Sequence, residues 1–153
     1  MSNFFNDDFI DFLKALQNNQ VKYLLVGGYA VIMNGYVRST SDMDVWINKT
    51  EENYLNLANA FYEFGAPIFS KTDFLSNDFD VWAIGREPNK IEILTAVKGI
   101  EFNESYSTHN LFDIGLFKVP FINLATLLKA KEAAGRYKDK ADIEELKKKN
   151  GDN

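Results

Sequence analysis

The apolar positions of the chain follow two spacings, one typical of helices and one typical of strands. Apolar residues three or four positions apart predict helices over residues 7–18, 29–34, 50–64, 123–134 and 138–149. Shorter apolar or alternating runs predict strands over residues 21–26, 43–47, 79–84, 90–96 and 114–119. This order predicts an α/β fold, with a small mixed β-sheet flanked by helices and with two C-terminal helices.

Local signals refine two helices and one connection. Asp7 or Asp8 is expected to cap the first helix, and Thr50 the third one. The apolar stripe of that third helix is expected to consist of Leu55, Ala58, Phe61 and Tyr62. Residues 85–89 predict a hairpin connection, whereas residues 99–110 are too polar to assign.

Length and composition predict one domain over residues 1–153, with a core of about 1–120 and a helical part of about 121–153. The absence of cysteine excludes disulfides, thiolate zinc sites and a cysteine nucleophile, and agrees with a reducing cytoplasm. The chain shows neither a signal-peptide pattern nor an apolar run that could span a membrane. We therefore expect a cytoplasmic protein without a membrane partner.

The net charge of −5 and the isoelectric point near 4.9 provide no overall attraction for nucleic acid. Residues 129–149 are locally basic, but lysines and arginines there alternate with acidic residues, as on a solvated helix face. Nucleic acid is therefore not indicated as a partner, although an RNA acceptor stays open.

Two carboxylates near a glycine pair are the strongest chemical signal. Gly27 and Gly28 end a buried run, and a glycine pair lets the backbone approach phosphate oxygens closely. Asp42 and Asp44 are two positions apart in an extended segment, so their side chains project from the same side. Like charges this close repel by roughly 1 to 4 kcal/mol. A divalent cation that holds a phosphorylated substrate is the simplest reason for the arrangement.

Two acidic residues on later predicted strands lie between apolar neighbours. Glu92 lies in an alternating apolar frame, Lys90-Ile91-Glu92-Ile93-Leu94. Asp80 has a similar apolar frame and is the rival candidate. A dinucleotide-binding motif is disfavoured, because the third spaced glycine that it requires is missing.

The glycine pair, a gap of thirteen residues and the Asp-Met-Asp-Val run resemble the nucleotidyltransferase superfamily with a DNA-polymerase-β-like core. The segment from Leu127 to Asp139 is similar to helical tails of small bacterial members, of the abortive-infection and toxin–antitoxin types. The Arg-x-Thr-x-Asp-x-Asp pattern of residues 38–44 is also similar to nucleotidyltransferases that modify lincosamide antibiotics.

The resemblance implies an Mg²⁺-dependent enzyme that transfers a nucleoside monophosphate from a nucleoside triphosphate to a hydroxyl group and releases pyrophosphate. The acceptor is a small molecule, a protein or an RNA. By this resemblance Asp42, Asp44 and Glu92 are the catalytic carboxylates, which hold one or two Mg²⁺ ions. The residues expected to contact the nucleotide are Gly27, Gly28, Arg38, Thr40, Lys131 and Arg136.

The chain also departs from the superfamily pattern. Many members have a serine where this chain has Gly28, so Ser39, Thr40 or Ser41 is the candidate for the missing hydroxyl. The third carboxylate is a glutamate instead of the more usual aspartate. The alternative function is therefore a catalytically degenerate protein that acts as a regulatory binding partner, such as an antitoxin.

Two expectations concern the C-terminal helices and the cleft. At least one of Lys131, Arg136 and Asp139 is expected to form a structural ion pair or a helix cap. A homodimer or a cognate partner protein is the candidate for completing the cleft, because the chain has few residues beyond its core.

Overall fold

A computed structural model describes residues 5–79 and 81–151 and contains a mixed, six-stranded sheet within them. Its strands are β1 (Tyr23–Val26), β2 (Met43–Ile47), β3 (Trp82–Ile84), β4 (Ile91–Leu94), β5 (Asn110–Asp113) and β6 (Lys118–Phe121). They lie in the order β3-β4-β2-β1-β6-β5. The pairs β2–β4 and β1–β6 are parallel, and the other neighbours are antiparallel. The predicted α/β class is confirmed.

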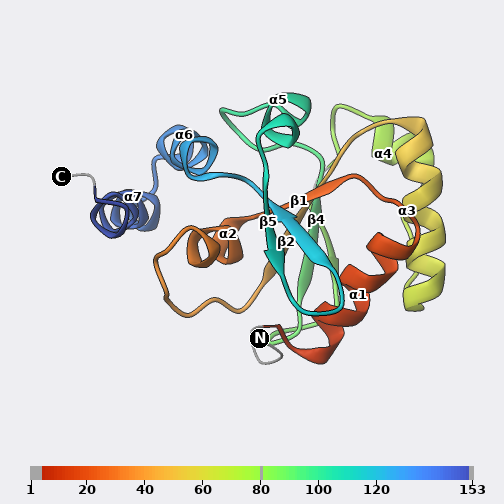
Figure 1. Cartoon of the computed structure of the whole chain (residues 1–153). Helices are drawn as coiled ribbons and strands as arrows, with labels where there is room; N and C mark the ends of the chain where they lie inside the picture. Colours follow the sequence, from red (N-terminus) through yellow and green to blue (C-terminus); the bar gives the residue numbers. More distant parts are fainter. Residues whose placement is uncertain (1–4, 80, 152–153) are drawn as a thin grey trace.

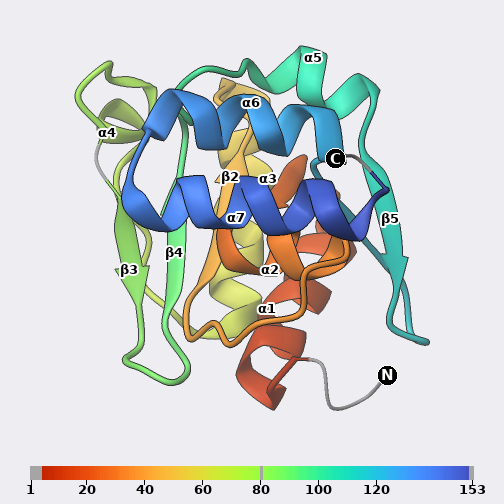
Figure 2. The ribbon, with the colours of Figure 1, turned by 90° about the vertical axis from the view of Figure 1, so that its left-hand side faces the viewer.

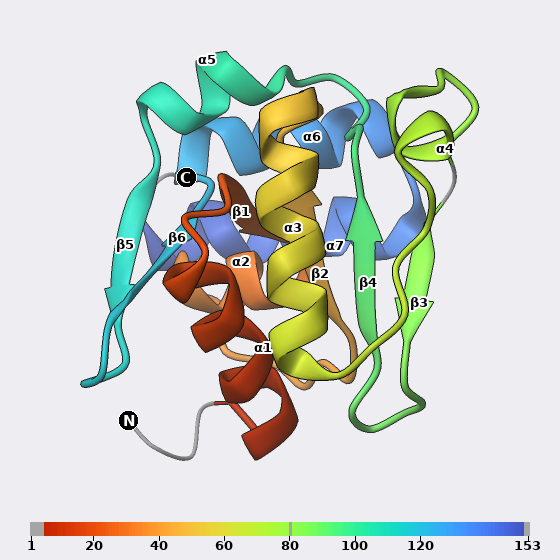
Figure 3. The same cartoon turned by 90° about the vertical axis from the view of Figure 1, so that its right-hand side faces the viewer.

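Helices cover both faces of the sheet. They are α1 (Asp7–Asn18), α2 (Gly27–Met33), α3 (Glu51–Phe64), α4 (Lys71–Leu75), α5 (Phe102–Ser107), α6 (Leu124–Ala134) and α7 (Tyr137–Lys149). Figure 1 shows the sheet nearly edge-on, with α1 and α3 on one side and α2, α6 and α7 on the other. Figures 2 and 3 show these two faces in turn. None of the described helices combines the length and apolarity needed to cross a bilayer.

Strand alternation divides the apolar residues between two cores. In β2, Met43 and Val45 are buried in the core beneath α1 and α3, whereas Trp46 belongs to the core beneath α2, α6 and α7. In β4, Ile91 and Ile93 face the first core in the same way. The intervening positions of both strands therefore face the C-terminal helices.

The C-terminal half of the sheet differs from the sequence prediction. A strand over residues 114–119 is wrong, because β5 and β6 form an antiparallel hairpin whose turn lies within that segment. The carboxylate of Asp113 accepts a hydrogen bond from the Gly115 amide, and Gly115 has a φ of 94°. This turn signal lies in the middle of the predicted strand. The short helices α4 and α5 were not predicted.

The bounds of α3 were predicted well, but its buried face was not. Thr50 caps the helix as expected, by accepting from the amide of Asn53. Leu55 and Tyr62 are 60% and 89% exposed, and the buried residues are Asn53, Leu57, Ala60 and Phe61. The buried Asn53 side chain accepts a hydrogen bond from the Lys22 amide and donates one to the Lys22 carbonyl, so its polar atoms have partners. Because Asn53 is polar, the buried face of α3 does not form a continuous apolar stripe in the sequence.

Helix α1 has the predicted bounds but a different cap, and α2 begins two residues earlier than predicted. The cap of α1 is Asn6, whose side chain accepts from the Phe9 amide, so Asp7 and Asp8 lie in the first turn instead. Helix α2 begins at Gly27, so the glycine pair forms its first turn and does not precede it.

Candidate functional site

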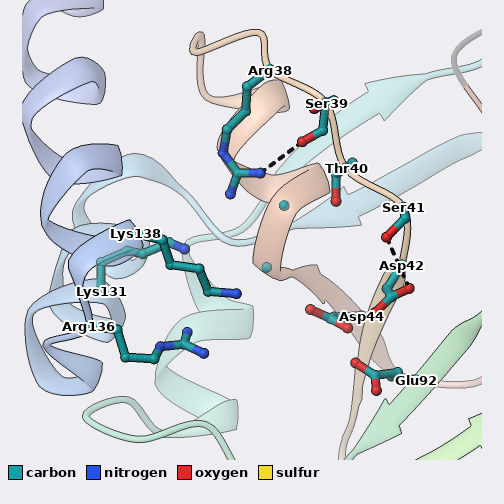
Figure 4. A pocket seen from close by; sticks show the side chains of 12 residues that line it. Arg38, Ser39, Thr40, Ser41, Asp42, Asp44, Glu92, Lys131, Arg136 and Lys138 are labelled. Atoms are coloured by element: carbon teal, nitrogen blue, oxygen red, sulfur yellow. Dashed lines mark hydrogen bonds between the residues drawn. The ribbon is translucent and has the colours of Figure 1, made fainter.

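Parallel neighbours β2 and β4 bring the acidic residues together. Asp44 and Glu92 are direct partners in the register of the two strands, and both face α6 and α7. Asp42 lies one residue before β2. All three line one cavity of about 540 Å³, shown in Figure 4. The other lining residues are Gly27, Gly28, Arg38, Ser39, Thr40, Ser41, Lys131, Arg136 and Lys138.

Every site residue expected from the sequence therefore lies at this cavity, with the exception of the rival Asp80, which falls outside the described residues. Sequence reasoning missed Lys138 as a lining residue. Lys138 follows Arg136 by two residues at the start of α7, and this proximity could have predicted that it lines the same cavity. Figure 4 shows Arg136 and Lys138 reaching from α7 toward Asp44.

The glycine pair is in close contact with two of these side chains. Gly27 has a φ of +64°, and a Cβ atom there would overlap the Asp44 carboxylate. A Cβ atom at Gly28 would overlap the Thr40 hydroxyl. Thr40 therefore occupies the space that a serine at position 28 would need, which favours it over Ser39 and Ser41 as the source of a hydroxyl at this point.

Burial and neighbouring charge act together on Asp44. Burial, followed by a hydrogen bond with Glu92 and by the charges of Glu92 and Asp42, raises the pKa of Asp44 to about 7. The nearby Lys138 acts in the opposite direction. The Asp44 Oδ1 atom is buried, and none of the described residues forms a hydrogen bond with it. A buried carboxylate oxygen without a partner is unfavourable unless a cation or a proton pairs with it.

Lys90 adds a positive charge among the carboxylates. Its Nζ atom lies 3.3 Å from a Glu92 oxygen and 3.8 Å from an Asp42 oxygen. The hydrogen bond to Glu92, together with the charges of Glu92 and Asp42, raises the pKa of Lys90. Sequence reasoning missed this residue, although its spacing of two from Glu92 on the same strand places both side chains on one side.

The opposite wall of the cavity carries a network of ion pairs. Arg38 donates two hydrogen bonds to Asp142, at 2.9 and 3.0 Å. Lys131 is buried and lies 2.9 Å from Asp142 and 3.2 Å from Asp139. Arg136 donates to Asp139 at 2.7 Å through its side chain and at 3.1 Å through its backbone amide, so the Asp139 carboxylate caps the start of α7. The expectation of a structural ion pair or cap in this segment is confirmed.

These pairs keep both aspartates ionised. Burial opposes ionisation of Asp139 and of Asp142, but their hydrogen bonds outweigh it and lower the pKa of each. Asp139 receives these bonds from Arg136 and Lys131, whereas Asp142 receives them from Arg38 and Lys131. The network connects the segment before β2 with α6 and α7, so it holds three cations along one wall.

The donor chemistry of the acidic wall fits magnesium, which prefers carboxylate oxygens and retains part of its shell for phosphates. The unpartnered oxygen of Asp44 is the strongest sign of that fit. As the side chains stand, no three acidic or histidine residues of the described chain are arranged as a ligand group. Lys90 instead bridges Asp42 and Glu92.

The comparison with solved structures supports the fold. No protein-family model and no curated protein matches the chain. A solved structure that does match is that of an antigenic nucleotidyltransferase-like protein from Paracoccidioides brasiliensis. The TM-score is 0.57 at 15% sequence identity, over 91% of this chain and 72% of that one. The chain thus has a nucleotidyltransferase-like fold, as its motifs predicted.

Proposed function

We propose that this protein is an Mg²⁺-dependent nucleotidyltransferase that transfers a nucleoside monophosphate from a nucleoside triphosphate to a hydroxyl group. One observation carries the proposal. Three carboxylates from two adjacent strands face a cationic wall across a single cavity, within a nucleotidyltransferase-like fold. A polyphosphate with bound metal has the charges that such a cavity complements.

Each wall has its own task. Asp42, Asp44 and Glu92 would hold the metal, which when bound stabilises charge on the attacking and leaving oxygens. Arg136 and Lys138 neutralise the phosphate chain from the other side. The Thr40 hydroxyl donates a hydrogen bond to a phosphate oxygen beside the first turn of α2.

The reaction itself is a displacement at the α-phosphorus. The acceptor oxygen forms a bond to this phosphorus, and the bond to the bridging oxygen of the β-phosphate breaks. Pyrophosphate leaves with the bonding electrons. Glu92, which lines the same cavity, accepts the proton of the attacking hydroxyl.

The position of the label tests this function. Each of the four nucleoside triphosphates, labelled at either the α- or the γ-phosphate, is incubated with the protein, Mg²⁺ and cell lysate. Transfer of the α-label, but not of the γ-label, to a larger product is expected. Asp44→Asn should abolish the transfer, whereas Asp11→Asn, an exposed exchange on α1, should leave it unchanged. Equal labelling by the wild type and Asp44→Asn contradicts the proposal.

A second candidate function is a degenerate member that binds a partner protein, such as an antitoxin. The bridge that Lys90 makes between Asp42 and Glu92 favours it, because a lysine can replace a metal ion as the neutralising charge. Calorimetric titration with Mg²⁺ and each nucleoside triphosphate separates the two. Binding of nucleotide only in the presence of Mg²⁺ supports the enzyme, and absence of all nucleotide binding supports the partner role.

A further inference from the structure

A second cavity opens directly beside the polar one. It has a volume of about 240 Å³ and shares Gly27, Asp44, Lys131 and Arg136 with the polar cavity. Beyond this shared boundary most of its lining is apolar, and we call this part the apolar chamber. Its walls include Leu94, Val97, Leu127, Ala130 and Ala134.

The chamber exists because small residues of α6 lie above the end of β4. Ala130 and Ala134 are four residues apart, so they lie on the same face of the helix. Leu94 and Val97, on the opposite wall, are only partly buried. Figure 2 shows α6 passing across β2 and β4 at this end of the sheet. Larger side chains at the two alanines would close the space.

The two cavities together have the polarity of a nucleotide. The polar cavity combines carboxylates with cations, as a metal-bound triphosphate requires. In the chamber beyond the boundary, the charged lining residues are Lys98 and Asp139, and Asp139 already pairs with Lys131 and Arg136. The boundary residue Asp44 carries the metal-side carboxylate. A ligand that spans both cavities therefore has a polyanionic end and a largely apolar end.

We propose that the apolar chamber binds the base of the nucleoside triphosphate whose phosphates occupy the polar cavity. This inference rests on the proposed function, since it assigns one half of the same substrate. The base lies between the α6 alanines and the residues that follow β4, and it fixes the α-phosphate beside Asp44. Ala130 and Ala134 are in this account the residues that make room for the base.

Filling the chamber tests the assignment. Ala130→Leu and Ala134→Leu each add a branched side chain to its wall, so one variant suffices if the other fails to fold. Ala125→Leu is the matched control, because Ala125 is exposed on the same helix and lies outside both cavities. Calorimetry measures the binding of ATP and of inorganic tripolyphosphate, each with Mg²⁺, and thermal unfolding checks the fold.

We expect the chamber variants to bind ATP at least tenfold more weakly than the wild type and to bind tripolyphosphate within twofold of it. Ala125→Leu should match the wild type with both ligands. Unchanged ATP affinity in the folded chamber variants overturns the assignment, and so does an equal loss for both ligands. A wild type that binds neither ligand overturns the proposed function itself. If the wild type binds ATP and tripolyphosphate with equal affinity, the phosphate site is supported and the assignment of the chamber to the base is contradicted.

Discussion

Asp44 is the residue in which folding and function conflict most directly. Its carboxylate is buried beside two other carboxylates and has a buried oxygen with which no described residue forms a hydrogen bond. In the metal-free protein this arrangement is unfavourable, because the folded state resists ionisation of a group that ionises freely when unfolded. A bound cation reverses that balance. By the proposed function, Asp44 lowers the stability of the metal-free protein and forms part of a site that the bound metal would complete.

We expect Asp44→Asn to stabilise the metal-free protein by about 1 to 3 kcal/mol at pH 8. The folded pKa of Asp44, about 7, lies above the unfolded value of 3.8, so the contribution of Asp44 to stability is fully present below pH 3.8 and is lost as the pH rises through 7. Asparagine does not titrate, so the gain should develop between pH 4 and 7. Urea unfolding with a chelator at several pH values measures it. A variant that is no more stable than the wild type at pH 8 contradicts this account of Asp44.

In the proposed site, Lys90 would compete with a metal ion for the oxygens of Asp42 and Glu92. Because its ammonium group lies against Glu92 and near Asp42, Lys90→Gln makes the acidic wall more negative. We expect Mg²⁺ to bind about three- to tenfold more tightly to this variant, which calorimetry at low ionic strength measures. Lys14→Gln, on the exposed surface of α1, is the control. Weaker Mg²⁺ binding by Lys90→Gln would show that the lysine supports the metal site and does not compete with it.

The Gly28–Thr40 contact explains a departure that the sequence left open. The sequence shows that position 28 lacks the serine found in many superfamily members. It does not show which residue supplies the hydroxyl group instead, since three hydroxyl residues follow in one loop. Only the folded chain places the Thr40 hydroxyl against Gly28. This contact depends on the path of the loop that brings Thr40 against the first turn of α2, and no local sequence pattern predicts that path.

A double-mutant cycle tests this contact. Gly28→Ala alone should destabilise the protein by about 1 to 2 kcal/mol, because the new methyl group overlaps Thr40. In a Thr40→Gly background the same exchange should cost less by at least about 0.5 kcal/mol. Chemical unfolding of the four proteins provides the coupling. Strictly additive effects would mean that the two residues do not share this space.

At the scale of elements, Asp142 joins α7 to both the segment before β2 and α6. It accepts hydrogen bonds from Arg38, and its other close partner is the buried Lys131. Both cations belong to the wall of the polar cavity. This arrangement makes the position of the cationic wall depend on the docking of α7, which Figure 2 shows in front of α2 and the sheet.

Asp142→Asn should destabilise the protein by about 1 to 3 kcal/mol at pH 7, because it leaves Lys131 with one partner and Arg38 with none of its carboxylate bonds. This range allows for the partial exposure of Arg38. The pKa of Asp142 is lowered by folding, so its contribution is present above the unfolded value and is lost as the pH falls through the folded one. The difference between variant and wild type should therefore shrink below about pH 4. Glu144→Gln, exposed on the same helix, is the control, and an equal loss in both variants contradicts the role of Asp142.

Elements with an uninterrupted pattern were the ones predicted from sequence. β2 and α3 have the expected bounds, because alternation and a Thr50 cap mark them locally. The face of α3 was wrong, since Asn53 is buried through hydrogen bonds to Lys22, a residue distant in sequence. The β5–β6 hairpin was missed because its turn lies among apolar residues. The buried face of α3 thus rests on a tertiary contact, whereas the hairpin turn is local and its Asp113–Gly115 signal was present in the sequence.

At the scale of the whole molecule, the order of the strands assembles the site. β2 and β4 are neighbours although α3, α4 and β3 lie between them in sequence, and the C-terminal helices return across the same face. The pairing of Asp42 with Asp44 was predictable from spacing alone. The approach of Lys131, Arg136 and Lys138 was not, because it requires α6 and α7 to close over the sheet. The apolar chamber arises from the same closure.

The central claim is that the three carboxylates and the cationic wall form one metal–nucleotide site. Calorimetric titration of ATP into the protein, with Mg²⁺ and with a chelator, tests it most directly in the wild type, Asp44→Asn and the surface control Asp11→Asn. We expect the wild type and Asp11→Asn to bind ATP only with Mg²⁺, and Asp44→Asn to bind it at least tenfold more weakly. ATP binding that is equally tight without Mg²⁺, or equally tight in Asp44→Asn, would contradict the claim.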